Sequence, residues 1–186
     1  MSLRPVNRKA RKYPNNAEEK AHLSLQTDSP SLIGVGPTDF FEQAARARGY
    51  RRIAGLDEAG RGPLAGPVVA AIVILPRRWS PVLLDDSKLL SEQQRQILYE
   101  AITTRALAWA IGLASEQEID ELNILGATRL ASCRALNHLA IPPDYLLLDA
   151  LHLPTVSVPQ QPVIKGDQLS RSIAAESIRP PSRKSR

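Results

Sequence analysis

Two short apolar runs, residues 52–56 and 68–75, flank a glycine-rich loop, and this arrangement constrains the fold more than any other feature. Both runs are bounded by Gly or Pro and consist largely of aliphatic or β-branched residues, as buried strands do. Only a loop lies between them, which allows a hairpin. Since a hairpin pairs its strands antiparallel, we expect a mixed sheet and not a fully parallel one.

Two capping boxes predict where helices begin. In each box a serine is followed three residues later by Glu or Gln, and an apolar stripe at helical spacing comes next; the pairs are Ser91 with Gln94 and Ser115 with Glu118. One helix is therefore predicted over about 91–104. A longer helix follows Ser115, with Gly126 as its candidate interruption and Pro142 as its limit.

The remaining apolar runs complete the predicted order of elements. Strand candidates cover residues 107–114, 145–148 and 162–164. A short helix, capped by Thr38 or Asp39, is predicted to run toward Gly49 ahead of the first strand. Strands separated by helices indicate an α/β layered domain with helices packed on the sheet.

Composition excludes several classes of protein. Hydrophobic residues make up 43% and charged residues 23% of the 186 residues, which is typical of a globular chain. The longest apolar run without Gly or Pro, 68–75, is far shorter than the roughly 20 residues of a membrane-spanning helix. The N-terminus does not resemble a signal peptide, and Cys133 is the one cysteine. We therefore expect a cytoplasmic protein without a membrane anchor.

Charge is distributed unevenly along the chain. Residues 1–12 hold five basic and no acidic side chains, residues 171–186 hold five basic and one acidic, and residues 13–170 are net negative. Such basic ends either aid solubility or bind a polyanion. Pro, Ser and Asn in the first part predict a disordered basic leader over 1–37, a catalytic domain over 38–178 and a basic tail over 179–186.

Carboxylates follow three of the predicted strands. Asp57 and Glu58 come after the first, Asp149 closes another, and Asp167 follows a third. Sites in open α/β sheets form in the crevice at strand ends, so these acids can converge. Hard oxygen ligands suit Mg²⁺ or Mn²⁺, and a pair of such ions can catalyse phosphate displacement. The alternative is that each acid is a turn or cap residue.

The loop after Asp57 and Glu58 is a second candidate feature. Gly60, Gly62 and Gly66 permit close backbone approach, so their amides can face a sugar or phosphate while Arg61 anchors the loop. A tight hairpin without a ligand explains the same glycines. The spacing matches neither a phosphate-binding P-loop nor a dinucleotide fingerprint.

Five ordered blocks in this chain closely resemble motifs of the ribonuclease HII family. They are GLDEAGRGPLAGPVVAA at 55–71, DDSKLLS at 85–91, IDELNIL with Ala127 and Thr128 at 119–128, LLLD at 146–149, and VIKGD at 163–167. The similarity covers about residues 52–177, two thirds of the chain. It implies an α/β, RNase H-like fold, in which a mixed sheet is flanked by helices.

The resemblance also implies an activity: endonucleolytic hydrolysis of the RNA strand of RNA–DNA hybrids, including single ribonucleotides in duplex DNA. By position, the family's four catalytic carboxylates match Asp57, Glu58, Asp149 and Asp167. The first three are the implied ligands of two Mn²⁺ or Mg²⁺ ions. Products would carry 3′-hydroxyl and 5′-phosphate ends, and no obligate protein partner is evident.

Substrate contacts follow from the same resemblance. Gly60, Arg61 and Gly62 match the loop that senses the ribose 2′-hydroxyl beside the scissile phosphate. Lys88 and Lys165 are candidate phosphate contacts, and a surface lysine is the alternative for each.

The chain departs from the family pattern at three places. Leu89 replaces a usual lysine, and Ala150 replaces a usual glycine. After residue 178, where the family continues with further helices, the chain ends in a tail rich in Pro, Arg and Ser, which predicts a C-terminally truncated or frameshifted member lacking those helices. The alternative function is then an inactive remnant that at most binds nucleic acid. Translating the downstream DNA in the other two frames tests the frameshift.

Overall fold

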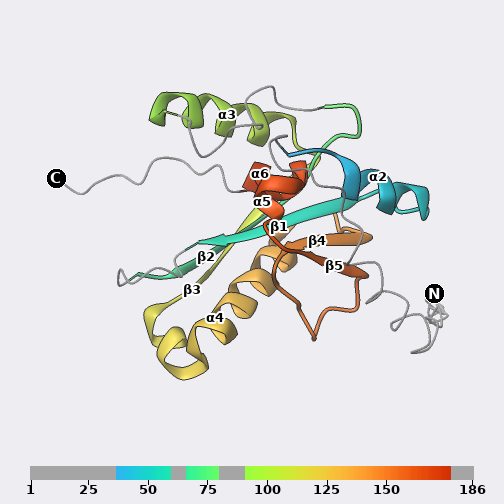
Figure 1. Cartoon of the computed structure of the whole chain (residues 1–186). Coiled ribbons are helices and arrows are strands. Elements are labelled where there is room, and N and C mark those ends of the chain that lie inside the picture. Colours follow the sequence, from blue (N-terminus) through green and yellow to red (C-terminus); the bar gives the residue numbers. More distant parts are fainter. Residues whose placement is uncertain (1–36, 60–65, 80–90, 177–186) are drawn as a thin grey trace, which may run out of the picture. The chain divides into compact units, whose positions relative to one another are not determined.

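A five-stranded mixed sheet forms the centre of the computed structural model, which describes residues 37–59, 66–79 and 91–176. The strand order is β3-β2-β1-β4-β5 (Figure 1). The strands are β1 (Ile53–Ala59), β2 (Val68–Ile74), β3 (Ala108–Ala114), β4 (Tyr145–Asp149) and β5 (Gln160–Val163). Neighbouring pairs β1–β2 and β2–β3 are antiparallel, whereas β1–β4 and β4–β5 are parallel. The expected mixed sheet is confirmed.

The first hairpin has the predicted antiparallel pairing, but β1 is longer than predicted. Its register runs from Ala54 opposite Ile74 to Ala59 opposite Val69. The predicted end at Leu56 is therefore wrong, and both acidic residues that follow lie within the strand. Backbone pairing with β2 does not depend on apolar side chains, so it continues through Asp57 and Glu58 to Ala59.

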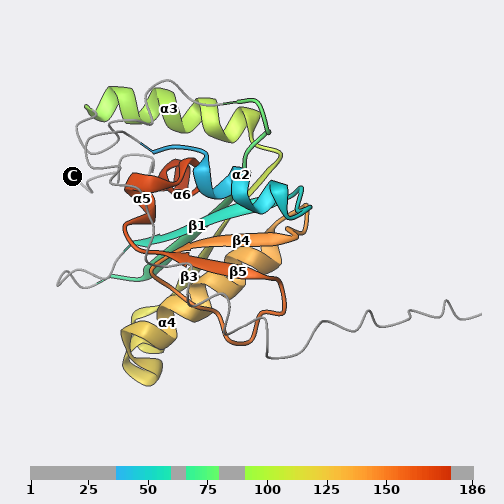
Figure 2. The same cartoon turned by 45° about the vertical axis from the view of Figure 1, so that its right-hand side comes forward.

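Helices cover the two faces of the sheet (Figures 1 and 2). One face packs on α4 (Glu116–His138), whose alanines contact β1, β2 and β3. The other face carries α2 (Phe40–Ala47), α3 (Glu92–Arg105), α5 (Gly166–Leu169) and α6 (Arg171–Glu176). Within the described part of the chain no helix is long and apolar enough to cross a membrane.

Both predicted capping boxes are present at the N-termini of α3 and α4. The Ser91 side chain accepts a hydrogen bond from the Gln94 amide, and Ser115 makes the equivalent contact in α4. The expected interruption of α4 lies at Asn123, which has φ +58°, and not at Gly126. The Asn123 Oδ1 atom accepts hydrogen bonds from the amides of Leu125 and Gly126, so it caps a second helical segment.

Gly55 lets α6 lie directly on β1. A Cβ atom on this residue would overlap the backbone carbonyl group of Ser172 and approach the Ile173 nitrogen to 2.6 Å. Backbone atoms at this contact belong to a buried helix start and cannot move aside like a flexible side chain. The absence of a side chain in the middle of β1 therefore sets how closely α6 approaches the sheet.

Replacing Gly55 with alanine is expected to lower the free energy of unfolding by about 1–3 kcal/mol, because the added methyl group overpacks the β1–α6 contact. Urea unfolding followed by circular dichroism measures this change. Gly66→Ala is the matched control, since nothing lies within 4 Å of the position that its methyl group would take, and it should change stability by less than about 0.5 kcal/mol. Equal effects of both variants would contradict the close packing of α6 on β1.

Candidate active site

Asp57 and Asp149 lie at the same end of two parallel neighbouring strands. The register pairs Leu56 of β1 with Leu148 of β4, and each aspartate is the next residue along its strand. Side chains alternate along a strand, so residues at matching positions on parallel neighbours point to the same face. Both aspartates therefore project from the face that carries α6, while Leu56 and Leu148 pack in the core beneath α4.

The segment after β5 brings Asp167 to this position. Val163 is the register partner of Asp149, and the chain then turns at Lys165, which has φ +56°, into the short helix α5. The Gly166 amide donates a 2.8 Å hydrogen bond to the Oδ1 atom of Asp149. This contact orients the Asp149 carboxylate and places Asp167, the next residue, beside it.

Glu58 occupies a different side of β1. Strand alternation places it opposite Ala70, which packs with alanines of α4, and so on the face away from Asp57. It is half-buried, and its charge still acts on Asp57. Asp57 and Asp149 thus lie on one face of the sheet, and Asp167 is close enough for its charge to act on Asp57. Glu58 lies on the opposite face of β1.

Burial and neighbouring charges make Asp57 unusual. The residue is 9% exposed, and desolvation is the largest cause that raises its pKa, to about 7 from 3.8. A 2.8 Å hydrogen bond from the Glu58 amide opposes the rise, while the charges of Asp149, Glu58 and Asp167 add to it. The charges of all three other predicted carboxylates therefore act on Asp57.

The chemistry of this cluster suits a hard divalent cation. All donors are carboxylate oxygens. A cation would offset the burial that chiefly raises the Asp57 pKa and the smaller repulsion from the neighbouring carboxylates. Asp57 and Asp149, which share a face, and Asp167, whose charge acts on Asp57, are the residues that would hold it, with Glu58 on the other face of β1. As arranged, however, the described residues include no group of three or more His, Cys, Asp or Glu side chains close enough to hold one ion.

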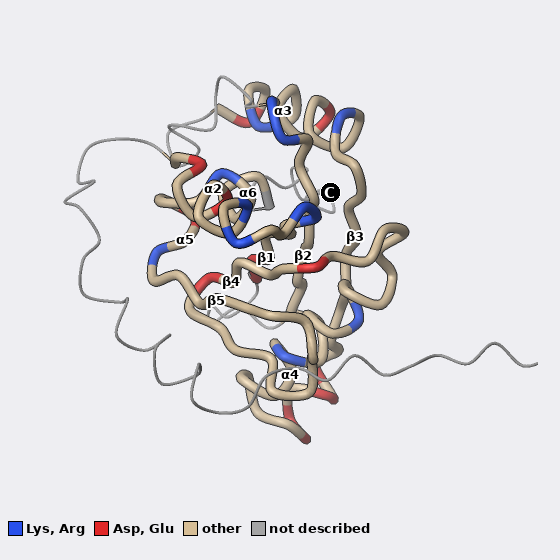
Figure 3. Tube along the Cα trace, turned by 90° about the vertical axis from the view of Figure 1, so that its right-hand side faces the viewer, with Lys and Arg blue, Asp and Glu red and all other residues tan. Residues whose placement is uncertain are grey.

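Several predicted substrate contacts fall on parts of the chain that the structure does not describe. Gly60, Arg61, Gly62 and Lys88 lie outside the described residues. Lys165 is described and exposed, immediately before the segment that contacts Asp149. It thus lies next to the carboxylate cluster. Figure 3 shows acidic positions near β1 and β4, with Lys and Arg positions around α2 and α6.

The backbone imposes two conformational requirements on the site. Ala150, directly after Asp149, has φ +46°, a left-handed conformation that favours glycine, and its amide bonds to the Val163 carbonyl. At Gly166, a methyl group would lie 2.5 Å from the Ile173 side chain. The usual family glycine at position 150, which Ala150 replaces, is the sequence signal for the first requirement.

The fold is that of an RNase H-like protein. Ribonuclease H2 from Pyrococcus horikoshii superimposes with a TM-score of 0.58 at 24% identity, over 69% of each chain. The structure of Bst-RNase HIII in complex with Mn²⁺ superimposes with a TM-score of 0.55 at 19% identity, over 73% of this chain and 52% of the RNase HIII chain. At these identities the likeness concerns the fold.

Sequence comparison adds the family. A family model described as ribonuclease HII matches residues 54–179, and the chain belongs to the ribonuclease HII family. Ribonuclease HII of Desulfitobacterium hafniense is 55% identical over 130 residues, which are 70% of this chain and 50% of that protein. The chain thus spans about half the length of that relative.

Asp57 should make stability depend on pH in metal-free buffer. Its folded pKa is raised, so between about pH 4 and 7 the folded protein keeps a proton that the unfolded chain has lost. The free energy of unfolding should therefore fall as pH rises through this range, and Asp57→Asn should remove that loss. At pH 8 we expect the variant to be more stable by up to about 4 kcal/mol, measured by urea unfolding.

Asp120→Asn is the matched control, because Asp120 is exposed on α4. Its stability should follow the wild-type pH dependence. The account fails if Asp57→Asn and Asp120→Asn show the same curve.

Ala150→Gly is expected to stabilise the chain by about 0.5–1 kcal/mol, because glycine adopts φ +46° without strain and this gain exceeds its larger entropy in the unfolded state. Thermal unfolding measures the effect. Ala101→Gly, inside α3, is the control and should destabilise by about 1 kcal/mol. Destabilisation by both changes would show that position 150 does not require a left-handed backbone.

Proposed function

We propose that this chain carries the catalytic carboxylates of a ribonuclease HII and hydrolyses the RNA strand of RNA–DNA hybrids, including single ribonucleotides within duplex DNA. The observation that carries the proposal is that Asp57 and Asp149 lie at matching positions on neighbouring parallel strands, with Asp167 next to the Gly166 amide that binds Asp149. The charges of Asp149 and Asp167 act on Asp57. Family membership supports the substrate class. The site of action would be the cytoplasm, with nucleic acid as the partner.

Metal binding is part of the proposal. Two Mn²⁺ or Mg²⁺ ions, when bound, supply an activated water and stabilise the departing 3′ oxygen. Asp57, the most buried of the four acids, would be one of the ligands, since the charges of the other three act on it. Asp149 would present its carboxylate in the orientation held by the Gly166 amide. A protein with this fold, Bst-RNase HIII, has been solved with Mn²⁺.

The side chains have a limited chemical task in this mechanism. No protein nucleophile is required, because water attacks the phosphorus. The carboxylates would bind the cations, and the backbone amide of Gly166 holds the Asp149 carboxylate in place. We assign recognition of the 2′-hydroxyl to Gly60, Arg61 and Gly62, and a phosphate contact to Lys88 and to Lys165.

A cleavage assay tests the proposal. The full chain, with Mn²⁺ or Mg²⁺, should cut a labelled DNA duplex that contains one ribonucleotide at a single position beside that ribonucleotide, and leave a 5′-phosphate end. Asp149→Asn should lower the rate by at least about 100-fold, because it removes a charged ligand from the cluster. The exposed Asp120→Asn should cleave like the wild type.

Binding of the duplex without cleavage at any metal concentration would contradict the proposal. That result would favour the alternative, in which the chain is an inactive remnant that at most binds nucleic acid. Cleavage that is unchanged in Asp149→Asn would exclude this carboxylate cluster as the active site.

A further inference from the structure

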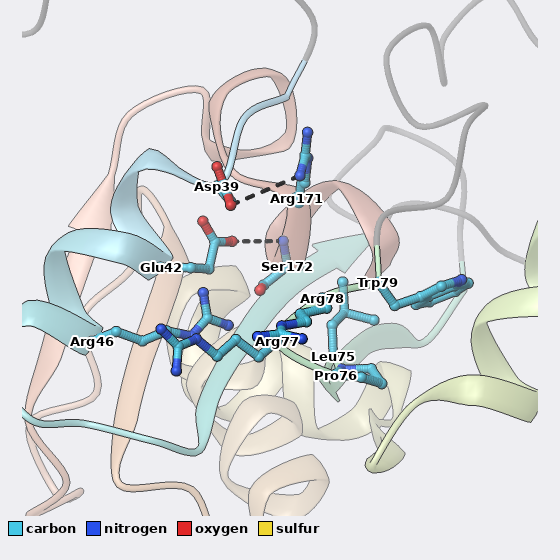
Figure 4. A pocket seen from close by; sticks show the side chains of 10 residues that line it. All are labelled: Asp39, Glu42, Arg46, Leu75, Pro76, Arg77, Arg78, Trp79, Arg171 and Ser172. Atoms are coloured by element: carbon cyan, nitrogen blue, oxygen red, sulfur yellow. Dashed lines mark hydrogen bonds and ion pairs between the residues drawn. The ribbon is translucent and has the colours of Figure 1, made fainter.

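A pocket of about 300 Å³ lies at the opposite end of β1 from the carboxylate cluster. Its walls come from α2, from the turn that follows β2 and from the start of α6 (Figure 4). Because Ala54 pairs with Ile74, residues 75–79 emerge where β1 begins, whereas Asp57 lies toward the end of the strand. The pocket is therefore separate from the proposed active site.

Four arginines line this pocket. Arg77 and Arg78 occupy the middle of a turn closed by a 3.1 Å hydrogen bond from the Trp79 amide to the Pro76 carbonyl, and Arg46 comes from α2. Figure 4 shows these three side chains gathered below Ser172. Among the described residues, none of the three has a carboxylate within ion-pair distance. Three cations brought together from two distant segments favour an anionic ligand.

The opposite part of the pocket is acidic. Asp39 is partly exposed, so a ligand can reach its carboxylate. Its Oδ2 atom also lies 3.9 Å from the Nη1 atom of Arg171. Glu42 is buried and fixed, since its Oε1 atom accepts hydrogen bonds from the Ser170 hydroxyl at 2.7 Å and the Ser172 amide at 2.9 Å. The pocket thus offers cationic donors and a carboxylate acceptor within one small volume.

An aromatic ring completes the lining. Trp79 is half-buried and packs beside α3, and Arg105 lies over its ring at 5.9 Å from the centroid. In Figure 4 it stands on the far side of the pocket from Arg46. A flat, partly exposed indole can support a planar group of a ligand by stacking.

We propose that this pocket binds a nucleoside phosphate. The arginines would hold the phosphate, the Asp39 carboxylate would accept a hydrogen bond from a ribose hydroxyl or base amino group, and Trp79 would contact the base. The volume is that of a small-ligand pocket. A duplex backbone fits less well, since its phosphates would meet the negative charges of Asp39 and Glu42. The proposal is independent of the proposed nuclease activity.

Isothermal titration calorimetry of the full chain with adenosine 5′-monophosphate tests this site. Binding is expected, with weaker binding of adenosine, which lacks the phosphate. The double variant Arg77→Gln/Arg78→Gln should weaken binding of the nucleotide at least tenfold, because it removes two of the phosphate donors. Arg95→Gln, on α3 and outside the pocket, is the matched control and should bind like the wild type.

Both arginines of the double variant are exposed, so its thermal unfolding should match that of the wild type. Three results would overturn the proposal. They are no binding of the nucleotide at millimolar concentration, equal binding by the double variant, and displacement of the nucleotide by a short DNA duplex whose own binding needs the same arginines. The last result would assign the pocket to a nucleic-acid surface.

Discussion

The parallel pairing of β1 with β4 is the constraint on which the site depends. It brings together residues that are about 90 positions apart and, by register, puts Asp57 and Asp149 at one level and on one face. The β4–β5 pair extends the same arrangement, so the turn after β5 delivers Asp167. A slip of one residue in either register would turn one aspartate to the opposite face, under α4.

This arrangement concentrates negative charge in a partly desolvated place, which by itself opposes folding. The raised pKa of Asp57 expresses that cost. The folded state tolerates this cost, because the core between the sheet and α4 consists of buried aliphatic residues, among them those of β1, β2 and β4. Sites that concentrate like charge in this way are characteristic of function, since a folded chain has no structural need for them.

Helix α6 links the two sites that we propose. Its start lies on Gly55 in the middle of β1, and Glu42 of α2 accepts a hydrogen bond from its Ser172 amide. Toward one end of β1 this packing supports the segment that carries Asp167, through contact of Ile173 with Gly166. Toward the other end it forms a wall of the arginine-lined pocket. The close contact between Gly55 and α6 therefore helps to position residues of both the carboxylate site and the arginine-lined pocket.

Local signals in the sequence predicted much of the fold. The capping boxes at Ser91 and Ser115 were predictable because each depends on residues three apart. The break at Asn123 was missed, since an Asx cap inside a helical pattern resembles an ordinary surface residue until its backbone is seen. That Glu58 and Asp57 point to opposite faces could not be predicted without knowing that β1 continues through both residues. The arginine pocket was beyond sequence reasoning, because its residues come from three separate segments.

Direct titration of the Asp57 carboxyl group tests the central claim, that carboxylates from distant segments meet around it. Carbon-13 NMR of the side-chain carboxyl in metal-free buffer should give a pKa of about 7 in the wild type, and a lower value in both Asp149→Asn and Asp167→Asn. An Asp57 that titrates near 4, or one whose pKa is unmoved by either substitution, would contradict the account.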